Sequence, residues 1–183
     1  MTQRGLPRVM RELRMLTGFV FLACFVLFAR PTPLSLAVAL PLFLAGLAIR
    51  AWAAGHLVKR KELTTSGPYA HSQNPLYLGS FLLMLGACVA ARSPWLPLVF
   101  LPAFALIHVP VVRAERELNR HHFGERFDEY AARVPAFVPA LRPRVEVHDS
   151  WSSRRYLANL EYNAAVGVLA AVLFLLLRLR GRI

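Results

Sequence analysis

The feature that most constrains the fold is the separation of apolar from basic residues along the chain. Long apolar runs alternate with short polar segments, and most of the 22 lysines and arginines lie in those segments. Hydrophobic residues make up 56% of the 183, yet the formal net charge is +12 at pH 7. A soluble domain could combine these properties only with difficulty. The sequence therefore predicts an integral membrane protein, whose basic segments face lipid headgroups rather than nucleic acid.

Five apolar runs predict an all-α protein with about five transmembrane helices. The runs are residues 15–29, 34–54, 76–91, 95–112 and 162–177. The first is shorter than the roughly 20 residues that cross a bilayer, and we expect it to be an uncleaved first helix. Gly79 and Gly86 in the third run are expected at helix-packing positions. We expect residues 1–183 to form one membrane domain, with an extra C-terminal helix within residues 156–178.

Basic residues gather on alternate sides of the predicted spans. Four basic residues lie in the N-terminal segment, four from the end of the second run to the start of the third, and nine between the fourth and fifth runs. Together these segments hold 17 of the 22 lysines and arginines. The positive-inside rule places these segments in the cytoplasm. We therefore expect the N-terminus and the polar segments that could form an active site to lie in the cytoplasm. The three C-terminal arginines fit this arrangement less well, but we expect the fifth run to cross.

The segment before the third run, residues 61–79, contains more polar, turn-forming and helix-capping residues than a connector between spans needs. It reads KELTTSGPYAHSQNPLYLG. Gly67-Pro68 indicates a turn. Asn74 suits the N-cap of a helix, and Pro75 suits its first position. A helix N-terminus with free N–H groups attracts carboxylates and other anions, so this segment is the predicted ligand site.

A second polar cluster follows the fourth run. Glu115 lies two helical turns from His108 and from His122. Glu115 is either a solvated, arginine-paired carboxylate or a partner for a ligand cation or hydroxyl, and His108 is either a packing histidine or a functional one. Spacings of about 10.5 Å along the helix are too long for these three to share one metal ion. Cys24 and Cys88 lie in apolar runs and read as packing residues, so no metal site is predicted.

These segments resemble the two signatures of the isoprenylcysteine carboxyl methyltransferase and phospholipid methyltransferase superfamily. The first is Leu63-x-x-x-Gly67-Pro68-Tyr69, followed by Asn74-Pro75-Leu76-Tyr77-x-Gly79. The second is Glu115, followed by Phe123-Gly124-x-x-Phe127-x-x-Tyr130-x-x-x-Val134-Pro135. A predicted helical hairpin separates the two. The resemblance covers residues 50–139, and it implies a short bacterial-type member of the superfamily in the inner membrane.

The resemblance implies an S-adenosylmethionine-dependent methyltransferase that acts on a lipid-like or amphiphilic acceptor entering from the bilayer. Its cytoplasmic cofactor pocket would be formed by the loop before the third helix and the polar helices after the fourth. Where the acceptor needs a base, Glu115 and His108 are the nearest candidates, and Arg113 lies close to the position of a substrate-contacting arginine. The implied cofactor contacts are Lys61, Glu62, Leu63, Thr64, Gly67, Tyr69, Asn74, Pro75, Leu76, Tyr77 and Glu115.

Three positions depart from the superfamily pattern. Gln73-Asn74 stands where Arg-His or Arg-Asn is common, Glu115-Arg116 replaces a frequent Glu-Glu pair, and Val111 takes the place of the substrate-contacting arginine. The acceptor group, whether carboxylate, thiol, amine or hydroxyl, therefore stays open, as does the oligomeric state. Two alternative functions also stay open: a nicotinamide-dependent enzyme related to sterol reductases, and a non-catalytic membrane scaffold that keeps the fold.

Overall fold

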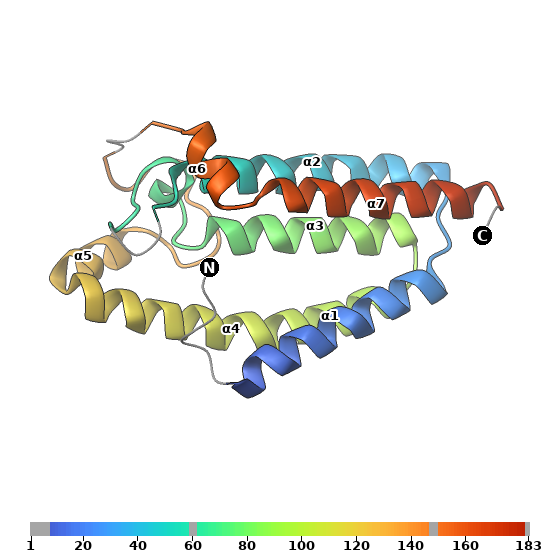
Figure 1. Ribbon diagram of the computed structural model, residues 1–183, viewed down its shortest axis with the longest axis horizontal. Helices are drawn as coiled ribbons and strands as arrows, with labels where there is room; N and C mark the ends of the chain where they lie inside the picture. Colours follow the sequence, from blue (N-terminus) through green and yellow to red (C-terminus); the bar gives the residue numbers. More distant parts are fainter. Residues whose placement is uncertain (1–7, 59–61, 147–149, 182–183) are drawn as a thin grey trace.

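The computed structural model describes residues 8–58, 62–146 and 150–181, with side chains from residue 16 onward. Every regular element in these ranges is a helix, which confirms the predicted all-α membrane fold. Five long helices lie lengthwise, and α5 and α6 both lie toward one end, which we call the polar end (Figure 1). The elements are α1 (Arg8–Phe28), α2 (Pro33–His56), the 3₁₀ helix η2 (Gly67–Ala70), α3 (Pro75–Ala91), α4 (Trp95–Phe123), α5 (Glu125–Arg133), α6 (Ser153–Ala158) and α7 (Tyr162–Leu179).

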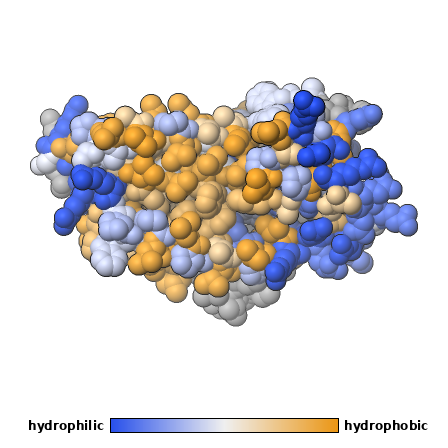
Figure 2. All heavy atoms as spheres, turned by 180° about the vertical axis from the view of Figure 1, so that it is seen from behind, coloured by the Kyte–Doolittle hydropathy of each residue, from blue (hydrophilic) through white to orange (hydrophobic). Residues whose placement is uncertain are grey.

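The surface has the polarity of a membrane protein. Hydrophobic side chains cover the middle of the molecule, and hydrophilic ones gather at its ends, most densely over the polar end (right in Figure 2). Large side chains such as Leu98, Leu106 and Leu169 are exposed on the helices. In the described part of the chain, α2, α4 and α7 are long and apolar enough to span a membrane, while α3 and residues 16–28 of α1 are apolar but shorter.

Helices α2 and α3 pack with their backbones in close contact. A Cβ added to Gly46 would lie 2.9 Å from the Gly79 carbonyl oxygen, and one added to Gly79 would lie 2.9 Å from the Gly46 carbonyl oxygen. Gly86, two turns further along α3, packs against the Phe43 ring, whose Cδ1 would lie 3.0 Å from an added Cβ. The glycines predicted in the third run are thus packing positions, and they fix α3 against α2.

The fourth helix is longer than the sequence predicted. The apolar run ends near Val112, but α4 continues without a break to Phe123 and includes Pro110. Glu115 therefore stands on the same rigid helix as His108. Gly124, with φ of 55°, separates α4 from α5. The chain then turns back at the polar end, where α5 buries Phe127 and Tyr130.

Helix α7 runs the length of the bundle beside α2 and α3, and it ends on the side opposite α5 (Figure 1). At the polar end, Arg50 of α2 forms an ion pair with Glu161, whose Oε2 lies 2.7 Å from Nη2. At the other end, the Arg178 guanidinium donates hydrogen bonds to the carbonyl oxygens of Val26 and Leu27 in α1. Polar contacts at both ends thus attach α7 to the bundle.

Candidate active site between α3 and α4

The loop before α3 is shaped by Gly67 and His56. Gly67 has φ of 59°, and a Cβ there would lie 2.6 Å from Nδ1 of His56, so this position needs glycine for both conformation and space. The buried imidazole of His56 donates from Nδ1 to the Trp52 carbonyl. Tyr69 follows in η2, with its side chain 7% exposed. The loop is therefore a packed structure and not a loose connector.

A segment after α5 binds along this loop. Residues 134–144, which we call the strap, hydrogen-bond to residues 69–74 through backbone and side chains. The backbone bonds run from Gln73 N–H to the Pro135 carbonyl, from Ala140 N–H to the His71 carbonyl and from Arg144 N–H to the Ala70 carbonyl, each 2.9 Å. Tyr130 adds a hydrogen bond of 2.8 Å from its hydroxyl to the Tyr69 carbonyl. The two signature segments are thus joined directly.

Gln73 and Asn74 belong to this junction. The Gln73 amide donates to the Val134 carbonyl at 2.6 Å and to the Ala131 carbonyl at 3.3 Å, which satisfies oxygens at the end of α5. Asn74 occupies the predicted N-cap position of α3, and Pro75 the first helical position. The prediction of a side-chain cap is wrong, because the Asn74 amide donates instead to the Ala136 carbonyl at 2.8 Å. Gln73, which departs from the superfamily pattern, therefore has a structural role in this protein.

We expect Gln73→Glu to lower the free energy of unfolding by about 1–3 kcal/mol, because it leaves carbonyl oxygens of α5 unsatisfied and brings a carboxylate against them. Thermal unfolding in detergent measures the change. Gln73→Arg keeps donors at this position and is the control, with a smaller loss expected. Equal stability of the wild-type protein and Gln73→Glu would contradict this role.

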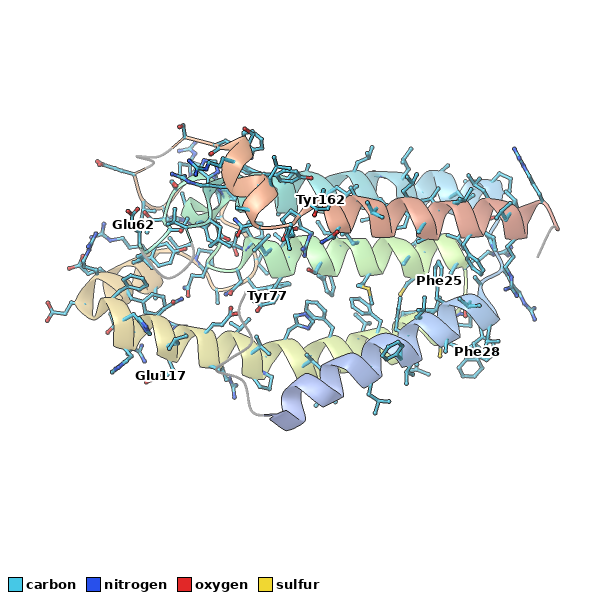
Figure 3. The ribbon with its side chains drawn as sticks, viewed as in Figure 1. Phe25, Phe28, Glu62, Tyr77, Glu117 and Tyr162 are labelled. Carbon is cyan, nitrogen blue, oxygen red and sulfur yellow. The ribbon has the colours of Figure 1, made fainter. Side chains whose placement is uncertain are left out.

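Three of the predicted site residues meet in the space between α3 and α4. The Tyr77 hydroxyl donates to Oε1 of Glu115 at 2.9 Å. The His108 ring packs edge-on against the Tyr77 ring, with centroids 5.3 Å apart. Tyr77 faces α4 in Figure 3, whereas Glu117 lies on the outer side of α4. Glu117 is two positions after Glu115, which is about 200° around a helix, so their carboxylates face opposite ways.

The environment of His108 fixes its tautomer. Its Nδ1 lies 3.0 Å from the Phe104 carbonyl oxygen, which can only accept, so Nδ1 carries the proton in the neutral ring. The basic lone pair is therefore on Nε2. The Phe104 ring stacks on the imidazole at a centroid distance of 3.8 Å and restrains its orientation. A fixed imidazole, a tyrosine hydroxyl and a carboxylate are groups that bind cations and accept protons.

Tyr69 lies close enough to this cluster to be influenced by its charge. Burial raises the pKa of the Tyr69 phenol well above its usual range, and the nearby Tyr130, Glu115 and Glu161 raise it further. The phenol therefore stays protonated at neutral pH. Tyr69 can donate a hydrogen bond, but it cannot serve as a phenolate.

The other predicted site residues lie around the cluster or away from it. Leu63 packs on the buried side chains of α5, and the Thr64 hydroxyl oxygen accepts the Val58 N–H at 3.1 Å. Glu62 is exposed at the polar end (Figure 3), and Arg113 is exposed on α4 about 200° from Glu115. The structure does not bring Glu62 or Arg113 to the cluster. Lys61 lies outside the described residues.

Two residues that the sequence analysis did not single out lie beside α3. Arg50 donates from Nη1 to the Leu76 carbonyl at 3.3 Å and to the Ser80 hydroxyl at 2.5 Å, and its Nη2 is paired with Glu161. In the sequence, Arg50 is a basic residue near the end of an apolar run, a pattern that indicates a contact with lipid headgroups. Its partner Glu161 is 111 residues further along the chain. Their pairing became visible only when α2, α3 and α7 were placed together.

A separate cavity of about 470 Å³, partly open to the outside, lies between α1, α2, α3 and α7. All of its lining residues are apolar, among them Phe25, Phe43, Met84, Gly167 and Phe174. Met84 is seven residues after Tyr77 on α3, so the cavity lies about 10.5 Å along the helix from the cluster. The chain thus combines a polar cluster with an apolar cavity among its apolar helices.

A family model described as phospholipid methyltransferase matches residues 34–126. The chain belongs to the phospholipid methyltransferase family. The matched segment includes Arg50, Tyr77, His108 and Glu115, and it ends before the strap and before α7. The predicted superfamily membership is therefore confirmed, and the Tyr77–His108–Glu115 cluster lies within the part of the chain that carries it.

Two curated relatives are similar over 94 residues, with 40% identity in each case. They are the nickel-cobalt-cadmium resistance protein NccN of Alcaligenes xylosoxydans xylosoxydans and the cobalt-zinc-cadmium resistance protein CzcN of Cupriavidus metallidurans. The aligned segment covers 50% of this chain and 44% and 43% of the two relatives. The chain therefore matches less than half the length of either relative. No solved structure matches the chain.

Proposed function

We propose that this protein transfers a methyl group from S-adenosylmethionine to a lipid-like acceptor at the cytoplasmic face of a bacterial inner membrane. The observation that carries the proposal is the hydrogen bond of 2.9 Å between Tyr77 and Glu115, with His108 beside it, inside the segment that matches the phospholipid methyltransferase family. The cytoplasmic location rests on the distribution of basic residues.

The residues of the cluster fit the chemistry of the cofactor. S-Adenosylmethionine supplies a methyl group carried on a positively charged sulfur. The half-buried carboxylate of Glu115 suits the cofactor's ammonium or ribose hydroxyls. The ring of Tyr77 offers an electron-rich face to a cation, and Tyr69 offers a hydroxyl donor. The Tyr77 hydroxyl holds Glu115 in one orientation, so the carboxylate is ordered before a ligand arrives.

The apolar cavity supports a lipid-like acceptor. Its volume of about 470 Å³ lies within the range of ligand sites, and its lining matches a hydrocarbon chain. A chain held there would place its polar group one or two helical turns closer to the polar end, at the level of Ser80 and Tyr77. The protein's contribution to the reaction would then be proximity and orientation of the two reactants.

The acceptor's chemistry decides whether the protein must also remove a proton. A carboxylate or thiolate acceptor needs no base, whereas an amine or hydroxyl acceptor does. Nε2 of His108 is the basic nitrogen of the fixed tautomer and is our candidate for that role, with Glu115 as the second. Arg113 faces away from the cluster, so we assign it no part in the reaction.

The names of the two relatives concern resistance to metal ions. This suggests an alternative function in which the protein binds a metal ion directly. Among the described residues, no group of three or more His, Cys, Asp or Glu side chains is placed to hold a metal ion. A connection of this chain to metal resistance would then be indirect, through modification of a membrane lipid. We therefore keep a lipid as the proposed substrate.

The cofactor is tested by isothermal titration of S-adenosylmethionine, S-adenosylhomocysteine and NADPH into the detergent-purified protein. We expect saturable binding of the first two at one site per chain and no binding of NADPH. Binding of NADPH alone would replace the proposal with the nicotinamide-dependent alternative. Binding of none by a folded preparation would favour the scaffold.

A further inference from the structure

We infer that Arg50 and Glu161 form a positioning pair that sets Tyr77 against Glu115, which makes the start of α7 part of the functional site. This inference deepens the proposed function, on which its consequence for cofactor affinity rests. The structural part, that α7 controls the first turn of α3, stands without a cofactor. Glu161 lies 35 residues beyond the end of the family-matched segment at residue 126.

The Arg50 guanidinium contacts both sides of the turn that carries Tyr77. Its Nη1 donates to the carbonyl oxygen of Leu76, the residue before Tyr77, and to the hydroxyl of Ser80, three residues after it. Ser80 in turn donates to the Leu76 carbonyl at 2.9 Å. The arginine therefore closes a small hydrogen-bonded network around this turn. Any shift of Arg50 is transmitted to the backbone on either side of Tyr77.

The path of the Arg50 side chain is fixed by its surroundings. Gly79 leaves room for it, since a Cβ there would lie 2.5 Å from Arg50 Cγ. The side chains of Arg50 and Glu161 are only 21% and 10% exposed. Removal of one partner of a largely buried ion pair is strongly destabilising, because the other charge is left buried without compensation. Glu161 is therefore needed to keep Arg50 in place.

Attachment of α7 alone does not account for this pair. The corner between α6 and α7 is already joined to α2 by Asn159, whose amide donates to the Ala54 carbonyl at 2.9 Å and to the Leu57 carbonyl at 3.3 Å. Trp151 adds a hydrogen bond of 3.0 Å to the Ala51 carbonyl. What Arg50 and Glu161 add is a connection from α7 to α3. That connection ends at Tyr77, whose hydroxyl orients Glu115.

The chain offers a matched control at the opposite end of the same helix. Arg178 also attaches α7 to the bundle through hydrogen bonds to backbone carbonyls. These bonds reach α1 and not α3, and Arg178 lies at the other end of α7 from Glu161. Glu161→Gln removes the charge next to Arg50 while keeping the shape of the side chain. Arg178→Gln loosens the other end of α7. A general effect of loosening α7 should appear in both variants.

The test compares full-length wild-type protein, Glu161→Gln and Arg178→Gln in detergent by hydrogen–deuterium exchange without cofactor. We expect amides within residues 74–82 to exchange about tenfold faster in Glu161→Gln, and to be unchanged in Arg178→Gln. Ser80→Ala, which removes one anchor of Arg50 without unpairing a charge, should give a smaller increase in the same peptide. Unchanged exchange in Glu161→Gln, or an equal increase in Arg178→Gln, would overturn the inference.

Titration with S-adenosylmethionine gives the second readout. We expect Glu161→Gln to bind about tenfold more weakly than wild type, with Glu161→Asp recovering part of the loss because it keeps the charge. Wild-type affinity in Glu161→Gln would overturn the effect on the site. Failure of the wild-type protein to bind S-adenosylmethionine would sink the proposed function instead, while the exchange comparison would still decide whether α7 positions α3.

Discussion

Replacing Glu115 with glutamine is expected to weaken S-adenosylmethionine binding by about 100-fold or more, because a partly buried carboxylate that pairs with a ligand cation contributes several kcal/mol. Glutamine keeps the size of the side chain and can still contact the Tyr77 hydroxyl, so the loss reports on charge and not on packing. Isothermal titration gives the dissociation constant, and thermal unfolding should show little change in stability.

Glu117 provides the matched control for this prediction. It lies on the same helix two residues away, points outward and pairs with Arg120 in solvent, with a side chain that is 76% exposed. Glu117→Gln should bind the cofactor as the wild type does. Tyr77→Phe removes the donor that orients Glu115 and should weaken binding by about tenfold. Equal affinity in Glu115→Gln and Glu117→Gln would remove Glu115 from the site.

Replacing Gly46 with valine is expected to lower the free energy of unfolding by about 3 kcal/mol, toward the upper end of overpacking effects. Its Cβ would meet the Gly79 carbonyl oxygen at 2.9 Å and Leu83 Cδ2 at 2.7 Å. The leucine can move, but the backbone carbonyl can do so only if α2 and α3 separate. Thermal unfolding in detergent measures the change.

Gly167 on α7 is the control position for this second prediction. A Cβ there meets nothing within 4 Å. Gly167→Val should therefore leave stability within about 0.5 kcal/mol of wild type, since valine has a higher helix propensity than glycine. A Gly46→Val protein as stable as Gly167→Val would contradict the close crossing of α2 and α3.

Sequence reasoning predicted the fold well where a local pattern carries the information. The length and apolarity of the runs located the long helices, and Pro75 marked a helix start through its backbone chemistry. Helix α4 was expected to end at Val112 and a separate polar helix to follow, because hydropathy reports the edge of the membrane and not the end of a helix. The charged residues 113–122 continue the same helix.

The site was predictable in its members but not in its connections. Tyr77, His108 and Glu115 were each selected from the sequence, and the structure brings them together across α3 and α4. Gln73 read as a lost cation, whereas it donates hydrogen bonds to the end of α5. The Arg50–Glu161 pair was not visible, because it depends on how α7 lies against α2. Contacts of this kind arise from tertiary packing, which local patterns do not encode.

The most direct test of the proposed function is transfer of a radiolabelled methyl group from S-adenosylmethionine into the lipid extract of membranes that contain the protein. We predict label in the organic-soluble fraction with the wild type and with Glu117→Gln, and label near background with Glu115→Gln. No label with a wild-type protein that binds the cofactor, or equal label with Glu115→Gln, would contradict the account.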